Sequence, residues 1–306
     1  MLEVNNLSIS FIQYQAGLRQ RNLQVISDLS IKIDAGKILA VVGSSGSGKS
    51  LLAHAILGIL PKNAMVSGSM LYKGTELTAE IQKKLRGTEI TLIPQSVNFL
   101  DPLMKIGEQV RCSVRSGNPG EKQKNIFKRY SLDEKAENQY PFQLSGGMAR
   151  RALVASAVVG GAGLIIADEP TPGLHPEIVK ETLGHLRELA DDGCAVMLIT
   201  HDIGTALSVA DNIAVFYSGT TVEIAPAIDF QGKGEALRHP YTKALWNALP
   251  QNDFQPVEGF QPSHSEFHKS GCLFGPRCSE SSQVCKCSTP EIRELRKGKV
   301  RCHNAT

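Results

Sequence analysis

Residues 37–50 read KILAVVGSSGSGKS, and this stretch decides the fold. From Ile38 to Val42 it is continuously apolar, which is typical of a buried central strand. The glycines that follow let backbone N–H groups approach phosphate oxygens, and the helix expected after them adds the positive end of its dipole. The stretch therefore predicts a strand, a phosphate-binding loop and a helix, in that order. The expected phosphate-binding residues are Gly43, Ser44, Ser45, Gly46, Ser47, Gly48, Lys49 and Ser50.

This order is that of the P-loop of nucleotide-binding proteins, in which the last two side chains have defined tasks. Lys49 is expected to reach the β- and γ-phosphates of ATP, and the Ser50 hydroxyl to bind Mg²⁺. The pattern also arises by chance in unrelated chains, so other motifs have to support it.

A second candidate element is residues 164–169, LIIADE, an apolar run that ends in two carboxylates. Phosphoryl transfer needs a metal-binding acid beside an acid that activates water. We assign Mg²⁺ binding to Asp168 and the role of general base to Glu169. The alternative is that the two acids form a solvated turn without a catalytic role. This alternative is less favoured in a chain that also carries a P-loop.

A histidine follows a third apolar run. Residues 195–200 predict a strand, and His201 comes directly after it. His201 is therefore a candidate to hydrogen-bond the γ-phosphate and the attacking water. A lone histidine is more often structural, so this assignment depends on the other motifs.

The remaining sequence alternates strand and helix patterns, which predicts an α/β fold with a largely parallel core. Residues 2–10 and 26–33 alternate apolar and polar side chains, as half-buried antiparallel strands do, so we expect a mixed sheet. Residues from about 96 to 160 lack a strand pattern and predict a helical subdomain inserted in an ATPase domain that spans residues 1–225. Residues 226–306 are rich in Pro, His and Cys and predict a C-terminal extension.

One short motif resembles the LSGGQ signature of ABC ATPases. It consists of Leu144, Ser145, Gly146, Gly147 and Met148. A serine and two glycines at a helix start can bind an anion, and in that family they contact a nucleotide held by another subunit. Ser145 could also be an ordinary helix N-cap. Its place about twenty residues before Asp168 favours the signature.

Gln95 resembles the Q-loop of the same family, which implies that it binds Mg²⁺ together with Ser50 and Asp168. Five motifs now occur in the family order, and residues 1 to about 225 are identified as an ABC-type ATPase. The resemblance implies a second ATPase subunit, two membrane permease subunits and a peripheral place on the cytoplasmic face of the membrane. An adenine-stacking aromatic is expected before the P-loop, and Phe11 and Tyr14 are the candidates.

The C-terminal part is similar to the extension of the oligopeptide, dipeptide and nickel group of ABC importers. The resemblance rests on residues 238–245, RHPYTKAL, and 271–278, GCLFGPRC. It implies peptide uptake with an extracytoplasmic substrate-binding protein, or the same role in a nickel or metal-chelate importer. A soluble ABC ATPase of DNA repair or translation is the alternative from another class. Such proteins carry a long coiled coil or a second ATPase domain, and this sequence has neither pattern.

Five of the seven cysteines lie between residues 272 and 302. Four of them, Cys272, Cys278, Cys285 and Cys302, are separated by five, six and sixteen residues. Cytosolic thiols rarely form structural disulfides, and the spacing is unlike that of most zinc knuckles. The family resemblance implies a 4Fe–4S cluster, with Zn²⁺ as the alternative. Cys287 is a spare ligand, whereas Cys112 and Cys194 are expected to be small buried side chains.

Residues 172–175 read PGLH where ABC ATPases usually have SALD. In the family this acidic residue lies at the dimer interface, and His175 cannot supply a carboxylate. The departure implies a partner ATPase that is not identical to this chain. The alternative is that His175 only begins the next helix, ahead of Pro176.

The overall composition excludes some partners. The net charge is +3 over 306 residues, so we expect no nucleic-acid partner. The first ten residues, MLEVNNLSIS, show no signal-peptide pattern, which predicts a cytosolic chain. The longest apolar stretch, residues 152–167, is interrupted by three glycines and is too short to span a membrane.

Overall fold

The computed structural model describes residues 1–14, 20–252, 254–255, 259 and 271–306. The chain divides into two compact units. The first unit contains residues 33–38 and 78–199 together with Met1, and the second contains residues 2–32, 39–77 and 200–306.

The first unit is built on three parallel strands in the order β6 (Ile90–Ile93), β7 (Leu164–Asp168) and β8 (Ala195–Thr200). Every side chain of β7 and β8 is buried, as their continuous apolar runs predict. Helix α6 (Pro176–Asp191) buries one face, and its Pro176 occupies the first helical position, where a missing N–H costs nothing. The short helix α2 (Ala79–Leu85) precedes β6.

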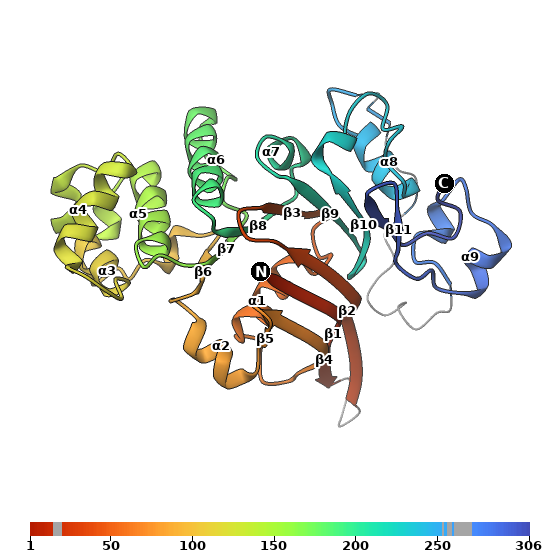
Figure 1. Cartoon of the computed structure of the whole chain (residues 1–306), viewed down its shortest axis with the longest axis horizontal. Helices are drawn as coiled ribbons and strands as arrows, with labels where there is room; N and C mark the ends of the chain where they lie inside the picture. Colours follow the sequence, from red (N-terminus) through yellow and green to blue (C-terminus); the bar gives the residue numbers. More distant parts are fainter. Residues whose placement is uncertain (15–19, 253, 256–258, 260–270) are drawn as a thin grey trace. The chain divides into compact units, whose positions relative to one another are not determined.

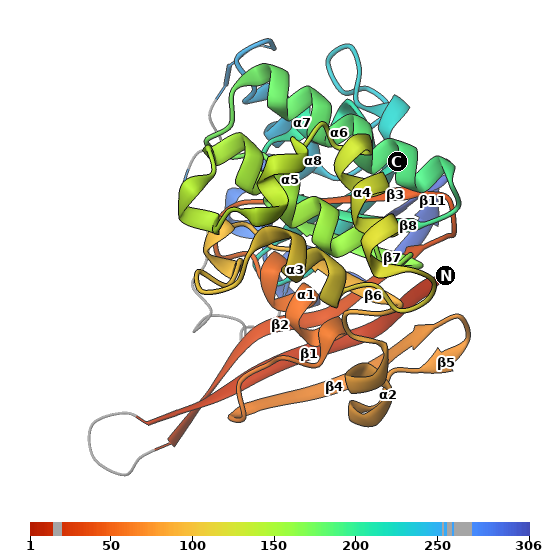
Figure 2. The ribbon, with the colours of Figure 1, turned by 90° about the vertical axis from the view of Figure 1, so that its left-hand side faces the viewer.

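Between β6 and β7 the assigned elements are all helical. They are η1 (Val97–Phe99), α3 (Ile106–Cys112), α4 (Pro119–Arg129), η2 (Glu134–Asn138), η3 (Pro141–Gln143) and α5 (Gly146–Val158). Figures 1 and 2 both show α3, α4 and α5 packed together. Phe127 and Tyr130 are fully buried there, and burial raises the pKa of Tyr130 to about 12. The Tyr130 ring meets the His185 ring edge-on at 4.3 Å.

The second unit holds two sheets. In the mixed sheet, β3 (Ile38–Gly43) is parallel to β9 (Asn212–Tyr217), and β10 (Thr220–Pro226) is antiparallel to β9. The sheet continues through β12 (Gly298–Val300) to β11 (Arg293–Leu295). This unit also contains helices α1 (Lys49–Leu57), α7 (Ile203–Leu207) and η4 (Ala227–Asp229).

The other sheet of this unit is antiparallel, and Figure 2 shows its long strands side by side. Its order is β2 (Gln20–Ile33), β1 (Leu2–Tyr14), β4 (Ala64–Tyr72) and β5 (Thr75–Glu76). The alternating patterns in residues 2–10 and 26–33 are thus strands, but they belong to a sheet of their own. Strand β4 was not predicted, because Gly68 and two serines interrupt its apolar pattern.

The C-terminal residues are part of the fold and not only an appendage. Beyond η4 they form α8 (Pro240–Asn247), η6 (Gly275–Arg277) and α9 (Gln283–Cys287), and then β11 and β12 extend the mixed sheet. Figure 1 shows α8 and β11, in shades of blue, near β10.

A buried carboxylate explains this attachment. Glu223 of β10 is fully buried and accepts hydrogen bonds from the backbone N–H groups of Arg238 (2.9 Å) and His239 (2.8 Å). It also pairs with the buried Arg238 guanidinium at 3.2 Å. Burial lowers the pKa of His239 to about 3, so the ring is neutral and its Nδ1 accepts the Tyr241 N–H at the start of α8. Partnering of this kind is what makes a buried carboxylate stable.

None of the helices in the described ranges has both the length and the apolar character needed to cross a membrane.

Candidate functional site

The glycine-rich loop has the predicted strand–loop–helix context within the second unit. Strand β3 ends at Gly43 and helix α1 begins at Lys49, with Gly48 at the N-cap in the left-handed region at φ +96°. Glycine adopts this conformation without the cost that a side chain brings. The buried Lys49 Nζ donates to the carbonyl oxygens of Gly43 (2.8 Å) and Ser44 (3.0 Å). The Ser50 side chain is exposed in the first turn of α1, as a Mg²⁺-binding hydroxyl requires.

The first residue of the loop lies too close to a neighbouring strand to carry a side chain. Gly43 is paired with Phe216 of β9 in the parallel ladder. A Cβ at Gly43 would lie 2.5 Å from the Phe216 carbonyl oxygen and 2.9 Å from Ser47 Oγ. The start of the loop is therefore fixed against β9, and only glycine fits there.

The predicted acidic pair ends strand β7 in the first unit. Asp168 is buried at the last position of the strand, and Glu169 is half-buried just beyond it. Glu169 has a backbone φ of +46°, which is uncommon for a residue with a side chain. Its N–H donates to the Ile199 carbonyl of β8 at 2.9 Å.

Arg150 connects the acidic pair to the predicted Q-loop inside the first unit. It lies in α5 and is 3% exposed. Its guanidinium donates to the carbonyl oxygens of Pro94 (2.7 Å) and Gln95 (2.9 Å) and to those of Glu169 (3.1 Å) and Pro170 (2.9 Å). The sequence alone assigns no contact to Arg150, because its partners lie 19 to 56 residues away.

The signature residues open helix α5. Ser145 is the N-cap, and its Oγ accepts the Met148 N–H at 3.3 Å. Ser145 and Gly146 are exposed, while Leu144, Gly147 and Met148 are half-buried. Ser145 is thus a helix N-cap. Because Ser145 and Gly146 are exposed, the start of this 13-residue helix can still bind an anion.

His201 follows β8, where the second unit resumes, and its side chain is exposed. The turn is fixed because Asp202 donates its N–H to Thr200 Oγ1 at 3.1 Å and caps α7 by accepting the Gly204 N–H at 2.8 Å. Gln95, Asp168, Glu169 and the signature thus belong to the first unit, and the P-loop and His201 belong to the second.

Known proteins share both the sequence and the fold. The ABC transporter family model matches residues 26–172. The oligopeptide transport ATP-binding protein OppD of Salmonella typhimurium is 31% identical over 98% of this chain and 92% of its own length. The chain belongs to the ABC transporter family. It is an ATP-hydrolysing transporter ATPase with the ABC-type P-loop fold.

Further comparisons extend to the C-terminal part. The dipeptide transport ATP-binding protein DppD of Haemophilus influenzae is 30% identical over 99% of this chain and 95% of its own length. The model of the oligopeptide/dipeptide transporter C-terminal region matches residues 222–285. A solved dimeric ATP-binding cassette with bound ADP and Pi shares the fold, with a TM-score of 0.64 at 24% identity over 76% of this chain and 100% of that one.

The C-terminal part of this ABC ATPase touches the P-loop. The buried Tyr241 hydroxyl is hydrogen-bonded to the Ser44 side chain, and burial, which outweighs this bond, raises the pKa of Tyr241. The Tyr241 ring packs against Tyr217 at 4.5 Å and Phe274 at 5.3 Å. Tyr241 lies within the quoted RHPYTKAL segment, but sequence alone gave no sign of this contact.

Four cysteines come together in the same region. Burial raises the pKa of Cys272, Cys278 and Cys302, and nearby thiolate charge raises it further. Cys285 differs, because hydrogen bonds from serines outweigh its burial and lower its pKa. Within the ranges that the structure describes, no three His, Cys, Asp or Glu side chains are arranged as a metal site.

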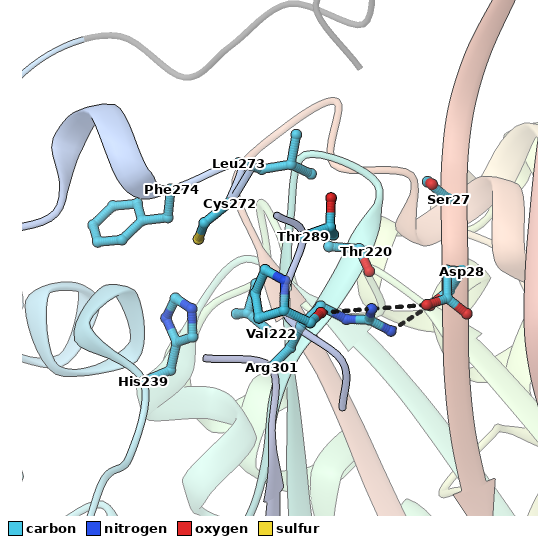
Figure 3. A pocket seen from close by; sticks show the side chains of 11 residues that line it. Ser27, Asp28, Thr220, Val222, His239, Cys272, Leu273, Phe274, Thr289 and Arg301 are labelled. Atoms are coloured by element: carbon cyan, nitrogen blue, oxygen red, sulfur yellow. Dashed lines mark hydrogen bonds and ion pairs between the residues drawn. The ribbon is translucent and has the colours of Figure 1, made fainter. Parts of the chain in front are cut away.

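Figure 3 shows Cys272 beside a small cavity that Phe274 and His239 also line. The cavity has a volume of about 60 Å³. An ion pair between Asp28 and Arg301, 2.7 Å apart, lies on its other side.

The other singled-out residues are placed as follows. Cys194 is buried as expected, but the expectation for Cys112 was wrong, because its side chain at the end of α3 is exposed. His175 is the N-cap of α6, is exposed and makes no capping hydrogen bond with its side chain. Phe11 is half-buried and Tyr14 is 68% exposed at the end of β1. Residues 15–19, which follow Tyr14, lie outside the described residues.

We expect Gly43→Ala to lower ATP affinity about 10- to 100-fold, because the new methyl group forces the loop away from β9 at a cost of about 1–3 kcal/mol. Titration with a fluorescent ATP analogue measures the change. Gly184→Ala in α6 is the control, since open space surrounds that glycine. Equal affinities of the two variants would show that the close approach of Gly43 is unimportant.

Proposed function

We propose that the chain is the ATP-hydrolysing subunit of an ABC importer that takes up peptides through separate membrane permease subunits. The observation that carries the proposal is the similarity to dipeptide and oligopeptide transport proteins, which extends over the C-terminal part as well as the ATPase motifs. The attachment of that part through buried Glu223 and Arg238 supports it, because the C-terminal region belongs to the folded protein.

Within this function the motif residues have individual roles. Lys49 and the loop N–H groups bind the phosphates, while Ser50, Asp168 and Gln95 would hold a Mg²⁺ ion, which would neutralise part of the phosphate charge. Glu169 orients and deprotonates the attacking water, and His201 contacts the γ-phosphate. The exposed Ser50 hydroxyl and the buried Asp168 carboxylate suit these tasks.

The proposed assembly has two ATPase subunits peripheral to two permease subunits, on the cytoplasmic face of the membrane. An extracytoplasmic binding protein selects the substrate. Both relatives described above are named for peptide transport, which favours peptides over nickel or metal chelates. The C-terminal match also favours an importer over a soluble ABC ATPase of repair or translation.

We expect Lys49→Ala to weaken ATP binding about 10- to 100-fold, because a charge-assisted phosphate contact is lost. Glu169→Gln should retain binding but lose about 10²- to 10⁴-fold in turnover, because an amide cannot take the proton. Equilibrium nucleotide binding and phosphate release, measured separately, distinguish the two effects. Hydrolysis by Glu169→Gln at the parent rate would exclude Glu169 as the base.

The partner ATPase is proposed to be non-identical, since His175 replaces the usual acidic residue. The site on this chain's own P-loop would then be intact, while the partner's site would receive the altered segment. We expect the chain with its partner to occlude ATP in two unequal sites, counted by trapping nucleotide and measuring hydrolysis. A fully active homodimer with two equal sites, unchanged by His175→Asp, would contradict the proposal.

A metal centre on the four C-terminal thiols is proposed as a structural element. The support is that Cys272, Cys278, Cys285 and Cys302 are near enough for their charges to interact. The described side chains are not arranged to hold an ion, so binding requires them to rearrange and to release protons.

We expect anaerobically purified protein to contain iron and sulfide, and Cys285→Ser to lose both. Cys287→Ser is the matched control, because Cys287 is exposed and is expected to be a spare. Elemental analysis and visible absorption provide the readout. Stoichiometric zinc without visible absorption would favour the alternative metal, and protein without either metal would exclude the site.

A further inference from the structure

Arg150 is a buried cation without a carboxylate partner in the part of the chain that the structure describes. All four of its hydrogen bonds end on backbone carbonyl oxygens. Burial lowers the pKa of this guanidinium. A cation is rarely held in this way, because burial normally demands a paired negative charge. We therefore expect the burial of the Arg150 guanidinium to serve a role in addition to packing.

The four carbonyl groups lie where two parallel strands separate. The ladder between β6 and β7 ends at Ile93 and Ala167. The next residue on the β6 side is Pro94, which has no N–H to continue the ladder. Arg150 donates to Pro94 and Gln95 on one side and to Glu169 and Pro170 on the other. One planar side chain thus joins the two strand ends beyond their last backbone hydrogen bond.

One of the joined residues is strained. Glu169 has φ +46°, and residues held in such conformations persist only where their surroundings fix them. Its N–H is held by Ile199 at 2.9 Å, and Arg150 Nη2 holds its carbonyl oxygen at 3.1 Å. Arg150 therefore supplies one of the backbone contacts that hold Glu169 in this conformation, and with it the direction of the Glu169 side chain.

The same arginine is rigidly connected to the signature. Arg150 lies four residues after Gly146 in α5, about 6 Å along the helix axis at 1.5 Å per residue. A displacement of the helix start by a nucleotide on the partner would therefore move the guanidinium as well.

We infer that Arg150 is a positioning residue that couples the signature helix to Glu169 and Gln95, so that the partner's nucleotide sets the activity of the base in this chain. The inference rests on the proposed role of Glu169. Only arginine suits the task, because its planar fork offers five donors, whereas lysine offers three from one nitrogen.

The test compares Arg150→Lys with Arg151→Lys in the full chain with its partner. Both substitutions keep the charge and lie on the same helix. The Arg151 side chain is partly exposed, donates to the Ser131 carbonyl and lies 3.8 Å from Glu181. The measurements are kcat and KM for ATP, equilibrium ATP binding and the thermal unfolding midpoint. Glu169→Gln and the double variant Arg150→Lys/Glu169→Gln complete the set.

We expect Arg150→Lys to lower kcat about 10- to 100-fold with KM within about twofold of the parent value, because the base is misplaced but the P-loop is unchanged. Arg151→Lys should keep kcat within about twofold. The double variant should hydrolyse ATP no more slowly than Glu169→Gln, because Arg150 acts through that residue.

Equal kcat values for Arg150→Lys and Arg151→Lys would overturn the inference, as would a further loss in the double variant. Arg150→Gln provides a second test if the lysine variant does not fold, and it should also lose kcat. Parent turnover in Arg150→Gln would overturn the inference as well. If Glu169→Gln itself retains parent turnover, the proposed base is wrong, and that result is separate from those for Arg150.

Discussion

The structure depends on how the backbone carbonyl groups at the ends of buried parallel strands are satisfied. At and just beyond the last ladder positions these oxygens accept hydrogen bonds from charged side chains that helices carry. At the end of β3, Lys49 of the following helix donates to Gly43 and Ser44. At the ends of β6 and β7, Arg150 of α5 does the same for four carbonyls. In both units a helix-borne cation completes the sheet where a functional loop begins.

Most of the strands and site motifs that could be predicted depend on patterns among residues that are adjacent in sequence. Continuous apolar runs identified β3, β7 and β8, and the P-loop required only the local order of strand, glycines and helix. The left-handed backbone of Glu169 could not be predicted, because neither its residue type nor its neighbours favour that conformation. The contacts of Arg150 could not be predicted either, since its carbonyl partners lie 19 to 56 residues away.

The place of the C-terminal strands in the sheet could not be predicted from the sequence either. Strands β11 and β12 have three residues each, too few to show an alternating pattern. Their place beside β10 is supported by a side chain that looks ordinary in sequence, namely Arg238, which pairs with Glu223 and donates to the Leu295 carbonyl of β11 at 2.6 Å. The exposure of Cys112 was predicted wrongly for a related reason, since a single residue type says little about its surroundings when helix packing decides burial.

The position of Glu223 also bears on how the chain matures during synthesis. Its carboxylate is made before Arg238, which pairs with it, and well before residues 298–300, which cover the edge of β10. Until residues 298–300 are added, the nascent sheet keeps β10 as an open edge, although Arg238 has by then been made and can pair with Glu223. Such edges attract chaperones and aggregation partners. The last strand to be made, β12, therefore covers β10, and a chain that stops short of it keeps the edge of β10 exposed, a defect that cellular quality control can recognise.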